Sequence, residues 1–380
     1  MQQRSNIAIT AIRHLHPPRR VRLPRVRRPF HLFPRVSLSS LLRVLCVTAL
    51  GLGTPLPLAA QAPAVRWSGL AYLDYAYTVS SPSEEIDGTS TFDYRRIYLT
   101  ADADLGSGFR SRVRLEASDR AQTVQARPTP FMKDAWVEWR YTESGHRATL
   151  GLQPQPLTDL QESVWGYRDL DQTVIDRSGY RGFRDIGLRL DGPILADGTV
   201  RYAAMVGNGN RERAEAAGAR GKIVYGELIL DPDGPFVGAV GADYEVNDLA
   251  DGARTTSLRT SAFAGVVGER FRGGLEAFYV AEETDAVLDT GTGPVGVEAP
   301  DGVGGSVHGA LVVAPRTSVV ARYDYIDRAA GREGAGEHYL LGAVSFRPAP
   351  PIRILPNVLV TMPEGTDATT IGRLTVYAQF

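Results

Sequence analysis

TIGRLTVYAQF, residues 370 to 380, is the last stretch of the chain, and its apolar side chains fall on every second position. A repeat of two predicts a β-strand with one apolar face. The stretch ends on an aromatic residue without a polar tail, which is typical of a strand whose outer face meets lipid. We therefore expect a membrane β-barrel that this strand closes, with a final aromatic resembling the signal that barrel-insertion machinery reads. The residues on the apolar face are Leu374, Val376, Ala378 and Phe380.

The composition excludes one class of membrane protein and leaves another open. Of the 380 residues, 43% are hydrophobic, and the mean hydropathy is -0.16. A bundle of transmembrane helices needs repeated runs of about 20 apolar residues, which this chain lacks. Barrel strands are only half apolar, so a transmembrane barrel fits this composition.

One apolar run, Leu41 to Leu58, follows a basic flank and precedes small residues that end at Ala62. This order is that of a secretory signal peptide. We predict that residues 1–62 are an N-terminal extension and signal peptide that is cleaved. Residues 63–380 are then expected to form a β-barrel in the bacterial outer membrane.

Three features of this N-terminal segment stay open. Ala60 and Ala64 are alternative cleavage points. A single membrane anchor is an alternative interpretation of the apolar run. Residues 1–40 carry nine arginines and no acidic residue, which is long for a signal peptide, so we interpret Met1 as a mis-assigned start.

The predicted mature chain relies on arginine for its positive charge. Without the ten arginines of residues 1–62, it has 32 basic and 43 acidic residues, and its only lysines are Lys133 and Lys222. The single cysteine, Cys46, lies in the segment that we expect to be removed, which excludes disulfide and thiol chemistry. The only basic cluster suited to nucleic acid lies there too, so no nucleic-acid partner is expected.

Alternating segments separated by Gly, Pro, Asp and Asn fill the rest of the chain. They predict an all-β fold, a transmembrane antiparallel barrel of about 16 strands. The segments are Trp67–Tyr77, Asp93–Leu105, Phe109–Ser118, Met132–Tyr141, His146–Leu152, Arg184–Asp191, Val200–Val206, Lys222–Leu230, Phe236–Val246, Thr255–Val267, Phe271–Val280, Gly305–Val313, Ser318–Ile326, His338–Phe346, Ile352–Thr361 and Thr370–Phe380.

The connections between these segments alternate in length. Short ones such as Leu105–Gly108 and Gly268–Arg270 fall between long ones such as Ser80–Phe92 and Ala281–Gly304. Outer-membrane barrels have short periplasmic turns and long external loops, and an even strand number places both termini in the periplasm. A soluble β-solenoid or sandwich does not need connections that alternate in this way.

The longest connection, Gln153–Phe183, is rich in apolar and aromatic residues. A structureless loop of this length is uncommon in a compact domain and is usually functional or disordered. We expect this third long loop to fold into the lumen and constrict it, and an external loop that packs on a neighbouring subunit is the alternative. The residues that we assign to the constriction are Trp165, Tyr167, Arg168, Arg177, Tyr180 and Arg181.

The alternation also assigns side chains to the two faces of the wall. Neighbouring strands place several arginines on the inner face, where guanidinium groups would offer charge and donors to a partly dehydrated anion. An alternative is that these arginines only pair with Asp102, Glu116, Asp134 and Glu138 and stiffen the wall. The predicted pore-lining and solute-binding residues are Arg96, Tyr98, Arg110, Arg112, Arg114, Arg189, Arg322 and Asp324.

Aromatic residues recur near the predicted strand ends on the outward face. Such residues are typical of the girdles at the two membrane interfaces. They are Trp67, Tyr75, Tyr77, Trp139, Tyr141, Tyr279, Tyr323 and Tyr325.

Several stretches resemble the phosphate-selective porin O and P family. The longest is WGYRDLDQTVIDRSGYRGFRDIGLRLDG, residues 165–192, and shorter ones are FDYRRIYLTADADLG at 92–106, MKDAWVEWR at 132–140 and ARYDYID at 321–327. The resemblance implies a sixteen-stranded, trimeric channel for passive diffusion of small hydrophilic solutes, with arginines and lysines that guide anions such as phosphate. This chain departs from that pattern because its predicted mature part has two lysines and a net negative charge.

No HExxH, GxSxG or Walker motif and no Cys/His metal cluster occurs in the sequence, so we expect neither an enzyme nor a cofactor. Ser306 and His308 share one face of a predicted strand and leave a barrel hydrolase as an alternative. A barrel with a plugged pore and a structural or adhesive role is another. The expected partners are outer-membrane lipid, the insertion machinery, two further copies of the chain and small solutes.

Overall fold

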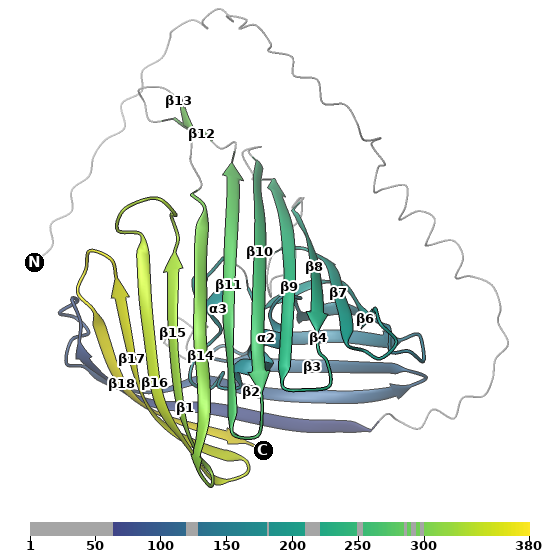
Figure 1. The fold of residues 1–380 in the computed structure, drawn as a ribbon, viewed down its shortest axis with the longest axis horizontal. Coiled ribbons are helices and arrows are strands. Elements are labelled where there is room, and N and C mark those ends of the chain that lie inside the picture. Colours follow the sequence, from purple (N-terminus) through teal and green to yellow (C-terminus); the bar gives the residue numbers. More distant parts are fainter. Residues whose placement is uncertain are drawn as a thin grey trace, which may run out of the picture. The chain divides into compact units, whose positions relative to one another are not determined.

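The alternating segments form a ring of antiparallel strands in a computed structural model (Figure 1). It describes residues 64–118, 128–180, 182–209, 221–248, 254–284, 287–289, 294–296 and 300–380. Sixteen strands of this described part close into one barrel, in which each strand pairs with its sequence neighbours and β1 pairs with β18. The predicted fold class is thereby confirmed. The predictions for residues 1–62 and for Arg181 lie outside the described residues.

Every predicted segment corresponds to one strand of the barrel. The strands are β1 (Val65–Ser80), β2 (Ser90–Gly106), β3 (Phe109–Ala117), β4 (Phe131–Arg140), β5 (Arg147–Pro154), β6 (Arg184–Pro193), β7 (Val200–Gly207), β8 (Lys222–Leu230), β9 (Phe236–Asp248), β10 (Arg254–Val267), β11 (Phe271–Thr284), β14 (Gly302–Ala314), β15 (Thr317–Asp327), β16 (Gly336–Ala349), β17 (Ile352–Pro363) and β18 (Thr369–Gln379).

The period of two separates the faces of each strand. In β8, Val224 and Leu228 are exposed on the outside, whereas Ile223, Tyr225 and Glu227 are buried on the inside. Successive side chains of a strand point to opposite faces, so an outer apolar face implies an inner face that carries the polar groups. The same division holds around the ring, where the exposed large side chains are apolar and the buried charged ones lie inside.

The seam between the first and the last strand is closed by backbone hydrogen bonds. The amide of Gly69 donates to the carbonyl of Phe380 at 2.6 Å, and the amide of Phe380 donates back at 3.0 Å. A Cβ atom at residue 69 would collide with the ring of Phe380, so a larger residue there would require that ring to move. The terminal aromatic is 72% exposed on the outside of the barrel.

Aromatic side chains cluster near the strand ends on the outer face. Trp139 stacks on Phe109 with ring centroids 5.6 Å apart, and Tyr75 lies 4.7 Å from Phe92. The first pair lies near the short turns and the second near the long loops. Seven of the eight predicted girdle residues are exposed, and Tyr325 is half-buried.

Two of the register shifts between strands bring an extra side chain to the inner face. The pairing of β1 with β2 shifts after Tyr72, and the pairing of β3 with β4 shifts after Arg114. Each shift is a β-bulge, which turns two successive side chains to one face. Arg95 joins Arg96 on the inner side in this way, and Lys133 joins the inner side at the second bulge.

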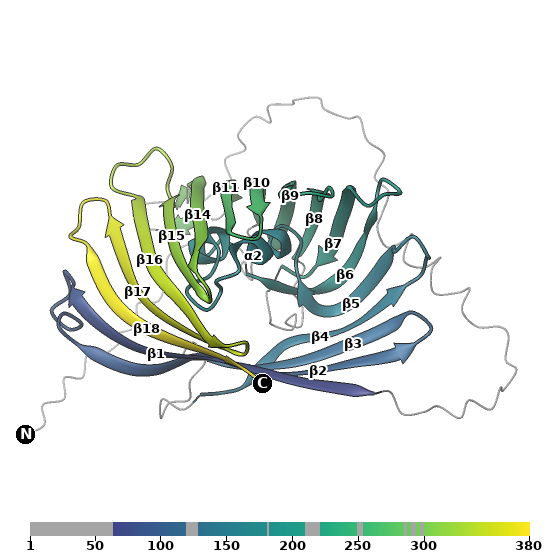
Figure 2. The ribbon, with the colours of Figure 1, turned by 60° about the horizontal axis from the view of Figure 1, so that its bottom comes forward.

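Four further elements of the described residues are not members of the ring of strands. A small hairpin of β12 (Val287–Asp289) and β13 (Pro294–Gly296), which the sequence did not predict, interrupts the connection from β11 to β14. The segment between β5 and β6, residues 155–183 and here called the inner loop, contains α2 (Asp159–Trp165) and α3 (Val174–Ser178). Figure 2 shows α2 inside the ring. No helix in the described ranges is long and apolar enough to cross a membrane.

Candidate functional site

The inner loop is fixed to one side of the barrel by apolar contacts. Trp165 and Leu170, both at most 1% exposed, belong to one cluster with Val320 and Leu341 on the inner faces of β15 and β16. The short helix α3 belongs to a second cluster with inner residues of β11 and β15, and Val164 of α2 to a third with inner residues of β9 and β10. Burial of these side chains holds the loop against β9–β17.

Arginines of the wall reinforce these contacts by donating to backbone carbonyls of the loop. Arg95 of β2 and Arg373 of β18 both donate to the carbonyl of Leu170, at 2.8 and 2.5 Å. Arg322 of β15 donates to the carbonyl of Gln172 and bonds Asp324. These arginines therefore hold a loop that has few regular hydrogen bonds of its own.

The arginine and aspartate predicted in β15 lie against the inner loop and are not exposed to the open lumen. Arg322 and Asp324 lie on the inner face as expected, but the loop covers them and leaves them 3% and 0% exposed. Their assignment as pore-lining residues stays a prediction, and in this structure their contacts are with the inner loop. Alternation predicts on which face of a strand a side chain lies. Whether another segment covers that face depends on the path of the inner loop, which is far from β15 in the sequence.

Arg189 has a similar position at the start of the loop. Its guanidinium bonds Asp191 on its own strand and Asp159 at the first turn of α2, with the latter contact 2.8 Å long. Arg189 is 8% exposed, so it contacts the start of the loop, and its role in lining the pore stays a prediction.

The inner face of β2–β6 carries the densest group of cations, here called the basic wall. Within it, three carboxylates are each shared by two cations. The pairs are Arg96 and Lys133 on Glu116 (3.1 and 3.3 Å), Arg114 and Arg184 on Asp134 (3.2 and 2.5 Å), and Arg110 and Arg147 on Glu138 (2.9 and 3.7 Å).

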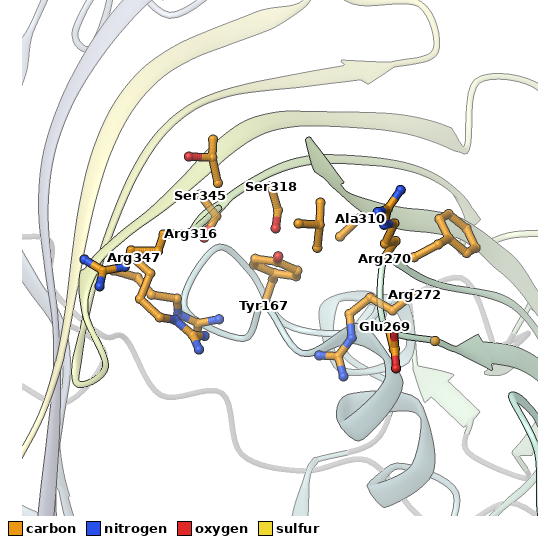
Figure 3. Close-up of a pocket in the computed structure, with 14 residues that line it drawn as sticks. Tyr167, Glu269, Arg270, Arg272, Ala310, Arg316, Ser318, Ser345 and Arg347 are labelled. Atoms are coloured by element: carbon orange, nitrogen blue, oxygen red, sulfur yellow. The ribbon is translucent and has the colours of Figure 1, made fainter. Parts of the chain in front are cut away.

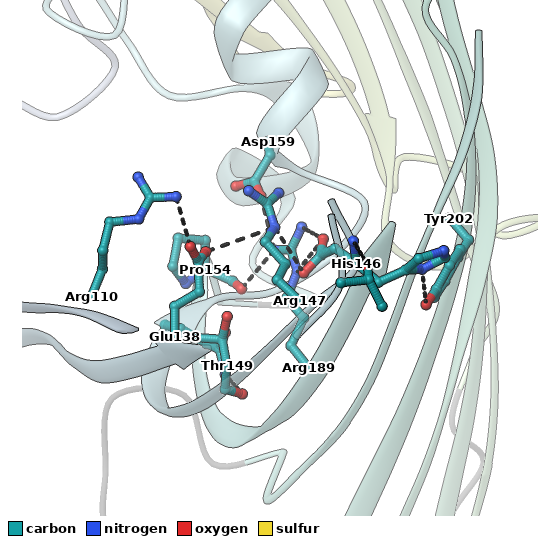
Figure 4. Close-up of polar contacts among 12 residues, drawn as sticks. Arg110, Glu138, His146, Arg147, Thr149, Pro154, Asp159, Arg189 and Tyr202 are labelled. Carbon is teal, nitrogen blue, oxygen red and sulfur yellow. Dashed lines mark hydrogen bonds and ion pairs between the residues drawn. The ribbon is translucent and has the colours of Figure 1, made fainter. Parts of the chain in front are cut away.

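Sharing leaves this wall with more positive than negative charge. Arg112 has its own partner, Asp102, at 2.7 Å, so ion pairing and surplus positive charge occur together. The side chains of Arg110, Arg112 and Arg147 are 49%, 32% and 30% exposed, so they face the part of the lumen that the loop leaves open. Figure 4 shows Arg110 and Arg147 on either side of Glu138, with Arg189 and Asp159 behind them.

Aromatic rings support the guanidinium groups of the basic wall. The guanidinium of Arg114 lies 4.9 Å from the ring centre of Tyr98, which also contacts Arg96 at 5.5 Å. Tyr98 is buried, so it holds these arginines in place and does not meet solute directly. A cavity of about 140 Å³ lies beside Arg112, Arg147 and the first turn of α2.

The predicted constriction residues of the inner loop point in different directions. Arg168 pairs with Asp176 at 2.8 Å within the loop, and Arg177 pairs with Glu337 of β16 at 2.6 Å. Trp165, Tyr167 and Tyr180 pack on the wall, the last against Phe278. Arg181, the sixth predicted residue, lies outside the described range.

Asp171 shows how strongly the loop is tied to the wall. It accepts a hydrogen bond from the hydroxyl of Tyr339, and its carboxylate lies near Arg322. Burial acts to raise the pKa of Asp171, but the positive charge of Arg322 and the Tyr339 hydrogen bond outweigh it, so the pKa lies below its ordinary value. Asp171 is therefore a charged anchor of the loop.

The inner face of β8 and β11 differs from the basic wall. Glu227 and Glu276 are 4% and 5% exposed, and neither forms an ion pair with a residue of the described part of the chain. Sequence reasoning did not single out these two carboxylates, although each lies at an inward position of its strand. These two buried acids therefore lie on strands that do not belong to the basic wall.

The residues of the possible hydrolase site lie under the inner loop. His308 packs between Trp165 and Phe263, with centroid distances of 5.0 and 6.4 Å, and Ser306 is 7% exposed. Among described residues, no carboxylate bonds the imidazole, and its Nε2 atom has no partner. The described residues also contain no His, Cys, Asp and Glu group that could hold a metal ion.

Known structures share this fold. The chain is similar to an anion-selective porin from Comamonas acidovorans (TM-score 0.61, 13% identity, 84% of this chain and 100% of that one). It is also similar to OprB from Pseudomonas putida (TM-score 0.60, 11% identity, 83% and 94%) and to the outer membrane channel DcaP of Acinetobacter baumannii (TM-score 0.59, 12% identity, 84% and 97%). The sequence matches no protein-family model and no curated protein. The chain thus has the sixteen-stranded barrel fold of outer-membrane porins.

Proposed function

We propose that the chain is an outer-membrane channel for passive diffusion of small hydrophilic solutes, with a preference for anions. The observation that carries the proposal is the basic wall, where Glu116, Asp134 and Glu138 each serve two cations. Three partly exposed guanidinium groups of that wall border the open lumen, where an arriving anion meets donors and positive charge together.

The inner loop gives the channel its narrow part in this proposal. It fills the side of the lumen along β9–β17, so solute passes between the loop and the basic wall. Each arginine of the wall keeps a carboxylate partner, which weakens its hold on a passing anion. Several weak sites in series permit both entry and exit, whereas one tight site would trap the solute.

The remaining membrane assignments belong to the same proposal. The outward apolar face and its aromatic clusters fit a lipid environment, with the short turns and both termini of the barrel chain in the periplasm. Export by a signal peptide, insertion guided by Phe380, and assembly as a homotrimer complete the proposal. A specific preference for phosphate stays a prediction from the resemblance of residues 165–192.

Planar-bilayer recording tests the proposal directly. Purified protein is inserted into a bilayer, the reversal potential is measured across a salt gradient, and phosphate is then added. A reversal potential of the anion-selective sign supports the basic wall as a selectivity device, and phosphate block supports the finer prediction. A cation-selective channel would contradict the anion preference. Absence of conductance would favour a plugged barrel.

A further inference from the structure

One aromatic side chain of the basic wall faces the lumen. Trp136 of β4 lies between the inward residues Asp134 and Glu138 and is only half-buried. Its partner on β3 is Arg112, whose guanidinium lies 5.7 Å from the centre of the indole ring. Its partner on β5 is Gly151, which has no side chain that could cover the ring. Part of an aromatic face is therefore open to solute.

The indole ring lines the cavity of about 140 Å³ beside the first turn of α2. One water molecule takes about 30 Å³ in the liquid, so this cavity holds about five waters, which is the space of one small planar ring. Pro154 adds a second apolar surface, and Thr149 also belongs to the lining. Figure 4 shows both residues beside Glu138 and Arg147. The cavity thus joins apolar and charged surfaces.

Two partly exposed cations of this cavity have donors that the described residues do not use. Arg147 approaches the carboxylates of Glu138 and Asp191 at only 3.7 and 3.8 Å, farther than a charge-assisted hydrogen bond reaches. Arg112 bonds Asp102 through its Nε and one terminal nitrogen, at 2.7 and 3.1 Å, and its other terminal nitrogen bonds no described residue. A carboxylate that enters the cavity would therefore meet donors from β3 and β5.

The acidic residues of the cavity limit the charge that a solute can carry. Three guanidinium groups and three carboxylates belong to the lining, namely those of Arg112, Arg147, Arg189, Glu138, Asp159 and Asp191. Because these charges balance, a second negative charge on a solute would meet repulsion from the carboxylates. A ring that stacks on an aromatic face adds attraction without adding charge. The cavity therefore suits a solute with one negative charge and one aromatic ring.

We propose that the face of Trp136, with Arg112 and Arg147 beside it, binds aromatic monocarboxylates and favours them among the anions that the channel passes. The carboxylate contacts the two guanidinium groups, and the ring lies on the indole and on Pro154. This inference rests on the proposed function, because it names the class of solute that passes the basic wall. It differs from the predicted preference for phosphate, which has no ring to stack.

Ligand-observed NMR on the folded barrel in detergent micelles tests this site without a membrane. Benzoate and cyclohexanecarboxylate are titrated separately, because they have the same charge and the same number of carbon atoms but only benzoate is aromatic. The wild type should bind benzoate about fivefold more tightly, since only an aromatic ring gains from stacking on the indole. Micelles without protein give the background for each acid.

Variants separate the contribution of the ring from that of the charge. Trp136→Leu should remove the preference for benzoate, whereas Trp136→Phe should keep part of it. Arg147→Gln should weaken the binding of both acids about tenfold and leave their ratio unchanged, because it removes a charge and no ring. The two positions lie on different strands, so a folding defect in one variant leaves the other informative.

Trp139→Leu is the matched control. Trp139 lies on the same strand as Trp136 but on the outer face, where it is 46% exposed, so its replacement should leave the benzoate preference unchanged. Equal affinities of the wild type for the two acids, an unchanged preference in Trp136→Leu, or an equal loss in Trp139→Leu would each overturn the proposal. A barrel that conducts anions without a benzoate preference would refute this inference alone, whereas a barrel without conductance would refute the proposed function.

Discussion

The side chains of Arg110, Arg112 and Arg147 on β3 and β5 reach the open lumen, whereas the inner loop covers that of Arg322 on β15. The guanidinium-bearing side chain of Arg110 is 49% exposed, and that of Arg322 is 1% exposed. Both form ion pairs of similar length, 2.9 and 2.6 Å. The difference lies in what the remaining donors do, since those of Arg322 bind the loop backbone and those of Arg110 are left for water and solute.

This difference predicts that the same substitution has unequal effects on the two sides. An ion pair exposed to water contributes little to stability, because solvent screens its attraction. Removal of one partner from a buried pair leaves an uncompensated charge in a low-dielectric site, which is strongly destabilising. Stability should therefore depend on the covered arginines, and selectivity on the exposed ones.

The largest effect is expected for Arg322→Met. It removes the partner that bonds Asp324 at 2.6 Å, leaves this 0% exposed carboxylate with Arg177 at 4.0 Å, and releases the carbonyl of Gln172. The free energy of unfolding should fall by about 3–5 kcal/mol. Denaturant unfolding of the folded barrel measures it, and Arg112→Met on the exposed side should lose less than about 1 kcal/mol. Equal losses would remove the distinction between the two sides.

Leu170→Ala should have the next largest effect. Its side chain is the part of the inner loop that packs on the wall at 0% exposure, and its removal leaves a cavity between loop and wall. A loss of about 3 kcal/mol is expected, together with a higher single-channel conductance as the loop loosens. Leu150→Ala, an outward residue that is 64% exposed, serves as control and should leave conductance unchanged. Unchanged conductance in Leu170→Ala would show that this loop does not narrow the path.

Replacement of Arg110, Arg112 or Arg147 by Gln, one at a time, should change selectivity with little loss of stability, because Glu138 keeps one of its two cations in each case. These side chains border the open lumen, so each lost charge weakens the attraction for anions by roughly 1 kcal/mol at contact distance. The anion-to-cation permeability ratio, taken from the reversal potential, should fall several-fold. Arg201→Gln in β7 removes one equal charge outside the basic wall and should leave the ratio near that of the wild type.

The smallest effect is expected for Asp102→Asn. It frees Arg112, whose side chain is 32% exposed, without deleting a cation. The anion preference should rise by about twofold, and stability should change by less than about 1 kcal/mol. High salt should abolish the gain, since the screening length falls from about 10 Å at 0.1 M to about 3 Å at 1 M. A lower anion preference would mean that Asp102 only holds Arg112 in place and does not reduce its attraction for anions.

Local pattern was enough to predict the strands and the faces of most side chains. Arg110, Arg112 and Arg114 lie on the inner side because alternation is a property of neighbouring residues. Arg95 was missed because the bulge after Tyr72 adds a residue that the period of two cannot reveal. Bulges depend on the pairing between strands, and no single strand records them.

Features that depend on contacts between distant residues could not be predicted from the sequence, for a different reason. Whether Arg189 or Arg322 meets solute depends on the path of the inner loop, which packs on strands more than a hundred residues away. A cavity of about 350 Å³ near the short-turn end of the barrel is lined by turn residues such as Arg270 and strand-end residues such as Arg347 (Figure 3). Its members share no spacing along the chain, because the closed ring alone brings them together.

The seam between β1 and β18 also constrains how the barrel can be made. Leu70 pairs with Gln379, so one hydrogen-bonding edge of the first strand stays unpaired until the last strand has formed. Contacts so distant in sequence form slowly, because a long chain segment loses freedom before the pairing stabilises it. Until then, two strand edges remain available to wrong partners. Gly69 and Phe380 thus lie where assembly finishes, and a defect there should appear as a lower yield of folded barrel.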